Sequence, residues 1–255
     1  MSDEPVLTSE DGGVLTITLN RPQAKNAVNQ ALAEGVAVAM ERLDADDGLR
    51  IGVITGAGGA FCAGMDLKAF VSGERPWVGD RGFAGITQRG PEKPLIAAVE
   101  GFALAGGFEI ALSCDLIVAA NNALFGIPEV KVGLVAAAGG LIRLPKRIPY
   151  HLAMELALTG DPIDAERAAA AGIVNRLAEP GEAVTVATEL ARRITRNAPL
   201  SLIASKKIVQ RTDDWTEEEA WAKAGEIGGP VFGSQDAQEG AKAFAEKRDP
   251  VWKGR

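Results

Sequence analysis

The chain has 255 residues, of which 47% are hydrophobic and only 5% aromatic, and its formal net charge is −7 at pH 7. This length suits one sizeable core, and an acidic chain without a long Lys/Arg run does not look like a general nucleic-acid binder. Two cysteines without CxxC spacing predict neither a disulfide framework nor a structural zinc site, and a single histidine excludes catalytic schemes that need two.

Residues 1–8 carry two acidic side chains and no apolar stretch, so no secretory signal is expected. No later apolar run free of charges and turn signals reaches the about 18 residues of a membrane span, which predicts a cytoplasmic protein. Residues 14–19 alternate like one strand of a hairpin, and residues 31–43 have helical spacing. Residues 50–55 form a short strand that enters a glycine-rich turn at 56–59.

The strand, turn and helix pattern then recurs. Strands are predicted at 94–99, 115–119 and 123–125, with a helix from Gly106 to about Cys114. Such short units predict stacked βα turns rather than separate domains. The segments with helical character after residue 148 are 152–159, 164–171, 181–196, 200–210, 216–225 and 234–247. Asn197-Ala198-Pro199 divides a core, residues 1–197, from a helical assembly region, residues 198–255, which packs on the body or on a neighbouring subunit.

The first candidate for chemistry is the start of the predicted helix at Gly106-Gly107. The first N–H groups of a helix have no intrahelical partner and lie at the positive end of its dipole, which suits a developing negative charge. The missing side chains let a ligand approach the backbone, and Glu109 lies about one helical turn on. A plain strand-to-helix junction, with Glu109 as a favourable first-turn carboxylate, explains the same residues.

A second loop of small residues spans 59–68, where the Met65 N–H could join the Gly106 N–H in a two-donor oxyanion hole. Its alternative is a glycine turn before a helix capped by Asp66. In a third segment Glu129 stands in an apolar run, where desolvation would raise its pKa. Its alternative is an exposed loop glutamate.

Together, two backbone turns and two carboxylates suit one task. The N–H groups hold an enolate-like thioester oxygen, while the carboxylates move protons and position water.

With these segments the chain resembles the crotonase superfamily, the enoyl-CoA hydratase/isomerase family, over nearly its whole length. The other shared motifs are Asn20-Arg21-Pro22 through Asn26-Ala27, Ala138-Gly139-Gly140 with Arg143-Leu144-Pro145, Leu158-Thr159-Gly160 with Ala165 and Gly172, and residues 243–248. The resemblance implies an α/β fold, a spiral of ββα turns with a C-terminal helical region. It also implies an acyl-CoA substrate, no metal and no cofactor beyond the substrate's own coenzyme A, and a homotrimer or a dimer of trimers.

The resemblance further implies an enoyl-CoA hydratase with assigned roles. Glu109 helps activate the water that attacks the β-carbon, Glu129 delivers the proton to the α-carbon, and the Met65 and Gly106 N–H groups form the oxyanion hole. The residues implied in coenzyme A binding are Lys25, Ala63, Met65, Asp66, Leu67, Lys68, Phe244 and Lys247. The last two would reach a neighbouring subunit's ligand, and the lysines suit phosphates as point charges. Each lysine is also explained as a solvated surface charge.

One departure bears on the reaction. Some dienoyl-CoA isomerases of the family place an acidic residue at the position of Ala137, as does the carnitinyl-CoA dehydratase pattern, yet residues 244–255 look especially like carnitinyl-CoA dehydratase. An acyl-CoA isomerase or a carnitinyl-CoA-type dehydratase therefore stays an alternative. A non-catalytic acyl-CoA- or RNA-binding member is a third, although both glutamates favour an enzyme. Residues 70–89 are expected to form an irregular, mobile wall of the acyl pocket, and Cys62 and Cys114 are expected to be buried thiols.

Overall fold

A computed structural model describes residues 4–255, and a six-stranded sheet lies at its centre. The strands, in spatial order, are β1 (Val6–Asp11), β2 (Val14–Leu19), β3 (Ile51–Gly56), β6 (Leu95–Val99), β8 (Leu116–Ala120) and β11 (Arg176–Ala178). The hairpin β1–β2 is antiparallel, and every other neighbouring pair is parallel. Strand β6 is buried at every position, as expected for a parallel sheet covered on both faces.

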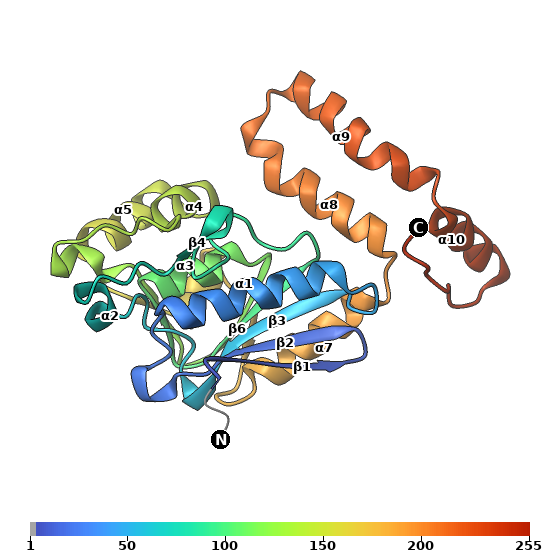
Figure 1. Ribbon diagram of the computed structural model, residues 1–255. Helices are drawn as coiled ribbons and strands as arrows, with labels where there is room; N and C mark the ends of the chain where they lie inside the picture. The colour runs from blue at the N-terminus through green and yellow to red at the C-terminus, as the bar shows by residue number, and fades with distance from the viewer. Residues whose placement is uncertain (1–3) are drawn as a thin grey trace.

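Helices α1 (Gln30–Ala45) and α7 (Ala183–Thr195) cover opposite faces of this sheet (Figure 1). Successive strand residues point to opposite faces, so alternate positions feed two separate cores. Leu15 and Ile17 pack in the cluster that contains α1, whereas Val14 packs in the cluster that contains α7. The residues that α7 buries fully are alanines, which let the helix lie close to the sheet.

A second, three-stranded sheet has the order β10-β9-β7, formed by Ile163–Asp164, Leu124–Gly126 and Phe102–Leu104. Strand β6 passes through Gly101, at φ +59°, into β7, which leads to helix α3 (Gly106–Ser113). Strands β8 and β9 likewise precede the short helix η4 (Pro128–Val132) and α4 (Gly140–Arg147). These are the ββα turns that the family resemblance implied. The sequence pattern did not reveal β7 and α4, because both are short and adjoin glycine-rich turns.

The segment expected to be irregular contains short ordered elements. They are α2 (Leu67–Val71), β4 (Trp77–Val78), η3 (Gly79–Arg81) and β5 (Gly82–Phe83). Residues 81–87 are buried, and the Phe83 ring makes an edge contact with Trp77 at 5.1 Å between centroids. Residues 81–87 are therefore packed against the body, whereas residues 71–80 are mostly exposed, and the mobility and the pocket-wall role of residues 70–89 stay predictions.

The remaining elements are mainly helical. They are η1 (Pro22–Ala24), η2 (Ala57–Gly59), α5 (Tyr150–Thr159), α6 (Ala165–Ala170), α8 (Pro199–Arg211), η5 (Thr212–Asp214), α9 (Glu217–Phe232) and α10 (Gln235–Glu246). Helices α9 and α10 lie away from the sheet, beyond α8 (Figure 1). Lys206 docks α8 on the body, because its Nζ lies 2.7 Å from the Asp115 carboxylate and donates to the Pro91 and Lys93 carbonyls. The division at residue 197 stays a prediction, and the linker between α7 and α8 contains it.

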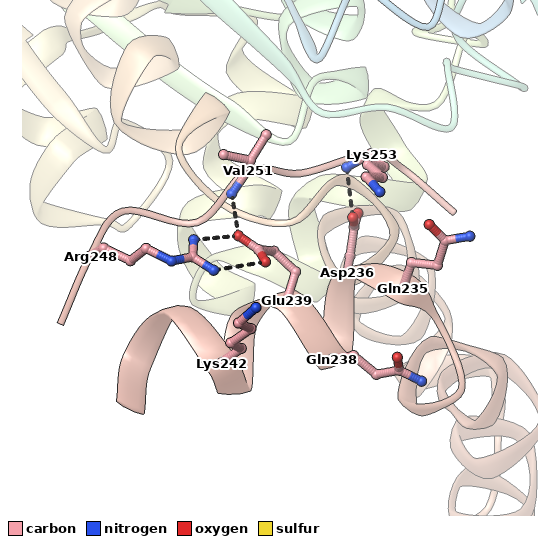
Figure 2. A pocket seen from close by; sticks show the side chains of 8 residues that line it. All are labelled: Gln235, Asp236, Gln238, Glu239, Lys242, Arg248, Val251 and Lys253. Atoms are coloured by element: carbon pink, nitrogen blue, oxygen red, sulfur yellow. Dashed lines mark hydrogen bonds and ion pairs between the residues drawn. The ribbon is translucent and has the colours of Figure 1, made fainter. Parts of the chain in front are cut away.

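The last residues fold back along α10 as a C-terminal strap, residues 248–255. Figure 2 shows the Glu239 carboxylate accepting hydrogen bonds from the Arg248 guanidinium at 2.6 and 3.0 Å and from the Val251 N–H at 2.9 Å. Asp236 accepts in the same way from the Lys253 N–H at 2.6 Å. These residues line a cleft of about 560 Å³. Its two carboxylates are occupied by the chain's own donors, so we assign this cleft to holding the strap. Among residues 4–255 no helix is both long and apolar enough to cross a membrane.

Candidate active site

Two backbone segments meet at the start of α3. The Leu104 N–H donates to the Cys62 carbonyl at 3.0 Å, which aligns the loop after Cys62 with β7. Gly64 follows with φ +99°, a conformation that side chains disfavour. A Cβ on Gly64 would lie 2.7 Å from the Ala105 Cβ and 3.1 Å from the Gly106 nitrogen. Only glycine therefore lets the two loops approach this closely.

This contact places the two predicted oxyanion donors beside each other. Met65 follows Gly64 directly, and Gly106 is the first residue of α3. Neither of their N–H groups has an acceptor in residues 4–255. The Gly106 N–H also lies at the positive end of the α3 dipole. The pair therefore offers two unpaired donors to a negatively charged oxygen.

Glycine is needed at positions 106 and 107 for a different reason from the expected approach of a ligand to the backbone. A Cβ on Gly106 would lie 2.5 Å from the Phe83 ring, and one on Gly107 would lie 2.2 Å from the Cys62 carbonyl oxygen. The space is filled by the chain's own groups, not left open for a ligand. Gly107 lets α3 pack on the loop after Cys62, and Gly106 lets the Phe83 ring pack against the donor backbone.

Glu109 points from α3 into the protein and is only 3% exposed. Its Oε1 accepts hydrogen bonds from the Ala138 and Gly140 N–H groups, both at 2.8 Å. Burial raises its pKa, while these two N–H groups and the Arg143 charge act in the opposite direction. The result is a carboxylate in a fixed orientation, held as an acceptor by two backbone donors.

Glu129 lies in η4, directly after Pro128. Its Oε2 is buried and has no hydrogen-bond partner in the part of the chain that the structure describes. Burial raises the pKa of Glu129 to about 7, and the nearby charge of Glu109 adds to this rise. The alternative of a freely exposed loop glutamate is therefore wrong. A carboxyl group with this pKa can give or accept a proton near neutral pH.

The first group of predicted coenzyme A contacts lies next to the donor loop. The Lys25 carbonyl accepts from the Ala63 N–H at 3.0 Å, while the Lys25 side chain is exposed and its Nζ lies 5.9 Å from the Phe102 ring centroid. Leu67 and Lys68 are exposed on α2. These exposed side chains lie on segments that adjoin the donor loop, and their contact with coenzyme A stays a prediction.

The Asp66 carboxylate has a structural task. It caps α2 by accepting from the Lys68 N–H at 3.1 Å and the Ala69 N–H at 3.2 Å, and it pairs with Arg21 at 3.0 Å. These contacts hold the pKa of Asp66 below its ordinary value, although burial opposes them. Helix capping, the alternative interpretation, accounts for this side chain.

The remaining predicted contacts are not brought to the two glutamates within one chain. Phe244 is 87% exposed on α10, and Lys247 ends that helix. Helix α10 lies far from α3 and α4 (Figure 1). These two residues therefore stay predicted contacts to a neighbouring subunit's ligand.

Sequence reasoning assigned no role to the N–H groups of Ala138 and Gly140 or to Arg143. The only signal was the motif that contains them, since the fold alone brings that turn to Glu109. The two thiols are buried as expected, and burial raises the pKa of Cys62 to about 12, which keeps it protonated. Residues 4–255 contain no group of three or more His, Cys, Asp or Glu side chains arranged to hold a metal ion.

Known proteins similar to this chain are hydratases and dehydratases that act on coenzyme A thioesters, by their names. The sequence profile of the enoyl-CoA hydratase/isomerase family matches residues 9–255. A carnitinyl-CoA dehydratase of Escherichia coli is 44% identical over 263 residues, with 100% of both chains covered.

Solved structures include an enoyl-CoA hydratase from Mycobacterium marinum that is 58% identical, with 99% of this chain and 100% of that chain covered and a TM-score of 0.97. A carnitinyl-CoA hydratase from Mycobacterium avium is 43% identical, with 100% of both chains covered and a TM-score of 0.80.

Proposed function

This chain belongs to the enoyl-CoA hydratase/isomerase family, and we propose that it adds water reversibly across the 2,3 double bond of an enoyl-CoA thioester by means of Glu109 and Glu129. The observation that carries the proposal is the presence of the buried Glu109 carboxyl group and the half-buried Glu129, whose Oε2 is buried, together with two unpaired backbone donors at Met65 and Gly106. Proton transfer needs no redox group, so coenzyme A enters only as part of the substrate.

The donors stabilise the charge that develops during addition. The thioester oxygen accepts hydrogen bonds from the Met65 and Gly106 N–H groups, and it becomes an enolate oxygen as water attacks the β-carbon. Preorganised donors of this kind favour the transition state over the ground state. The contact between Gly64 and Ala105 fixes their spacing.

The two carboxyl groups divide the proton transfers. Glu109, held as an acceptor by two N–H groups, takes a proton from the attacking water. Glu129, whose pKa is about 7, carries a proton that it delivers to the α-carbon. The product is a 3-hydroxyacyl thioester, and the reverse sequence removes water. After hydration Glu109 releases its added proton to solvent and Glu129 takes up a proton from solvent, which restores both groups for the next turnover.

A polar acyl group is the second candidate substrate, because a carnitinyl-CoA dehydratase is 44% identical over the whole chain. Two observations favour a simple enoyl group instead. The position that carries an acidic residue in the carnitinyl pattern is Ala137, beside the Glu109 donors. The hydratase structure also superposes better, with a TM-score of 0.97 against 0.80.

A substrate panel tests the proposal. Crotonyl-CoA, longer enoyl-CoAs and a carnitinyl-type thioester are incubated with the enzyme, and loss of the conjugated absorbance is read together with the product mass. Hydration adds the mass of one water, whereas isomerisation adds none. We expect Glu129→Gln and Glu109→Gln to lose turnover, while Glu166→Gln, an exposed control on α6, keeps it. Unchanged turnover by Glu129→Gln would favour the non-catalytic alternative.

We also propose that the chain assembles as a trimer or a dimer of trimers through its C-terminal helices. Trp221, Phe232 and Phe244 are 76%, 86% and 87% exposed, an unusual concentration of large apolar side chains on two helices. Sedimentation equilibrium gives the mass directly. A monomer at micromolar concentration would rule out the assembly, and with it the contact of Phe244 with a neighbour's ligand.

A further inference from the structure

Arg143 lies on α4, at the turn that holds Glu109, and is half-buried. Its Nη1 donates to the Ala138 carbonyl at 3.4 Å. A Cβ on Gly139, which has φ +109°, would lie 2.0 Å from the same nitrogen. The guanidinium is therefore packed on the backbone of the Glu109-holding turn, residues 138–140. The N–H groups of that turn face Glu109, while its Ala138 carbonyl faces Arg143.

The other arm of the guanidinium reaches a different segment. Arg143 Nη2 donates to the Thr87 carbonyl at 2.5 Å. The Thr87 N–H in turn donates to the Phe83 carbonyl at 3.2 Å, which closes a tight turn, residues 83–87, with Ala84 and Gly85 at positive φ. The Phe83 ring packs on Gly106, one of the proposed oxyanion donors. The Arg143 side chain thus joins the backbone of the Phe83 turn, residues 83–87, to the backbone of the turn that orients Glu109.

We propose that Arg143 is a positioning residue that fixes the Glu109-holding turn and the Phe83 turn relative to each other. An arginine suits this task because its donors point in fixed directions from a rigid plane, whereas a lysine offers one compact ammonium group. The effect on turnover rests on the proposed function, but the bridge between the two turns does not. Because Phe83 borders the donors, loss of the bridge changes discrimination between acyl chains as well as rate.

The test compares three variants with the wild type. Arg143→Met removes both hydrogen bonds, and Arg143→Lys keeps the charge without the fork. Arg147→Met is the matched control, because Arg147 is also on α4 but donates to the Leu112 carbonyl at 2.6 Å. For each protein, kcat and KM are measured with a short and a long enoyl-CoA. Amide hydrogen exchange is followed in peptides that cover residues 83–88 and 136–141.

For Arg143→Met we expect kcat to fall by about 10²-fold with a much smaller change in KM, since a displacement of roughly 1 Å at a reacting group has this effect. The ratio of kcat/KM between the two chain lengths should shift, and exchange should accelerate in both segments together. Arg143→Lys should recover only a minor part of kcat. Arg147→Met should match the wild type in all of these measurements.

Three outcomes would overturn the inference. Arg143→Met and Arg147→Met could lose kcat equally, only one segment could exchange faster, or Arg143→Lys could restore wild-type kcat, which would show that charge alone acts. If the wild type hydrates no enoyl-CoA, the proposed function fails separately. The amide exchange data then test the Arg143 bridge by themselves. Faster exchange in both segments of Arg143→Met supports the bridge, and unchanged exchange refutes it.

Discussion

Gly64 sets the distance between the two proposed oxyanion donors, so Gly64→Ala is a direct test of the site. The new Cβ would lie 2.7 Å from the Ala105 Cβ, whereas non-bonded carbon atoms prefer about 3.5 Å or more. The two loops must then separate by roughly 0.8 Å at this point. At φ +99° the alanine also costs roughly 1–3 kcal/mol of backbone strain.

A displacement of this size at the donors predicts a large kinetic effect. We expect kcat for enoyl-CoA hydration to fall by about 10²-fold, equivalent to about 3 kcal/mol of transition-state stabilisation. The assay follows the conjugated thioester absorbance under saturating substrate. Urea unfolding of the same sample separates the kinetic loss from a loss of folded protein.

Gly59→Ala provides the matched control. Gly59 has φ +77°, so alanine is strained there too, but its Cβ would meet no atom within 4 Å. We expect a loss of unfolding free energy comparable with the strain in Gly64→Ala, and wild-type kcat. If Gly64→Ala keeps wild-type kcat, or if both variants lose kcat equally, the reasoning about the donor spacing is refuted.

Three further predictions concern titration and stability. Because Glu129 has a pKa of about 7 and must be protonated for hydration, kcat/KM for hydration should fall as pH rises through about 7, and the dehydration direction should show the opposite limb. A pH-independent profile in both directions would remove the proton-donor role. The folded pKa of about 7 lies above the ordinary value of 4.5, so the folded state binds more protons, and stability falls as pH rises from 4.5 to 7. The loss has an upper bound of roughly 3 kcal/mol, reduced because the side chain is partly exposed. Glu129→Gln should abolish that loss, which urea midpoints at pH 5 and pH 8 will show. Lys206→Met removes the ion pair with Asp115, which keeps only its two neutral donors, from Leu95 and Gln210, and it also leaves two carbonyls without their donor. It should cost about 3 kcal/mol, whereas exposed Lys207→Met should change the unfolding free energy by less than about 0.5 kcal/mol; equal effects would contradict the docking role of Lys206.

The family and the central elements could be predicted from the chain alone. Alternating or continuous apolar runs marked β2, β3, β6 and β8, because burial on both faces of a parallel sheet demands them. The motif residues predicted the enoyl-CoA hydratase/isomerase family, and the family profile and the full-length relatives confirm this. The roles of individual site residues stay predictions until the variants are measured.

The sequence also identified Glu109, Glu129, Met65 and Gly106 as candidates, since carboxylates and glycine turns are visible as residue types. It could not give their environments. The packing partners of Gly106 and Gly107 come from segments more than twenty residues away, namely Phe83 and the Cys62 loop, so only the folded backbone shows that the space is filled.

Tertiary structure alone decided the electrostatics of the site. Burial raises the pKa of both glutamates, but Glu109 accepts from N–H groups about thirty residues later in the chain, which oppose the rise, whereas Glu129 Oε2 is buried without a partner among the described residues. Arg143 shows the same limit, because the carbonyls that it joins, those of Ala138 and Thr87, come together only through packing of α4. Local sequence determines which groups are present, and long-range packing determines how much water and which donors each group retains.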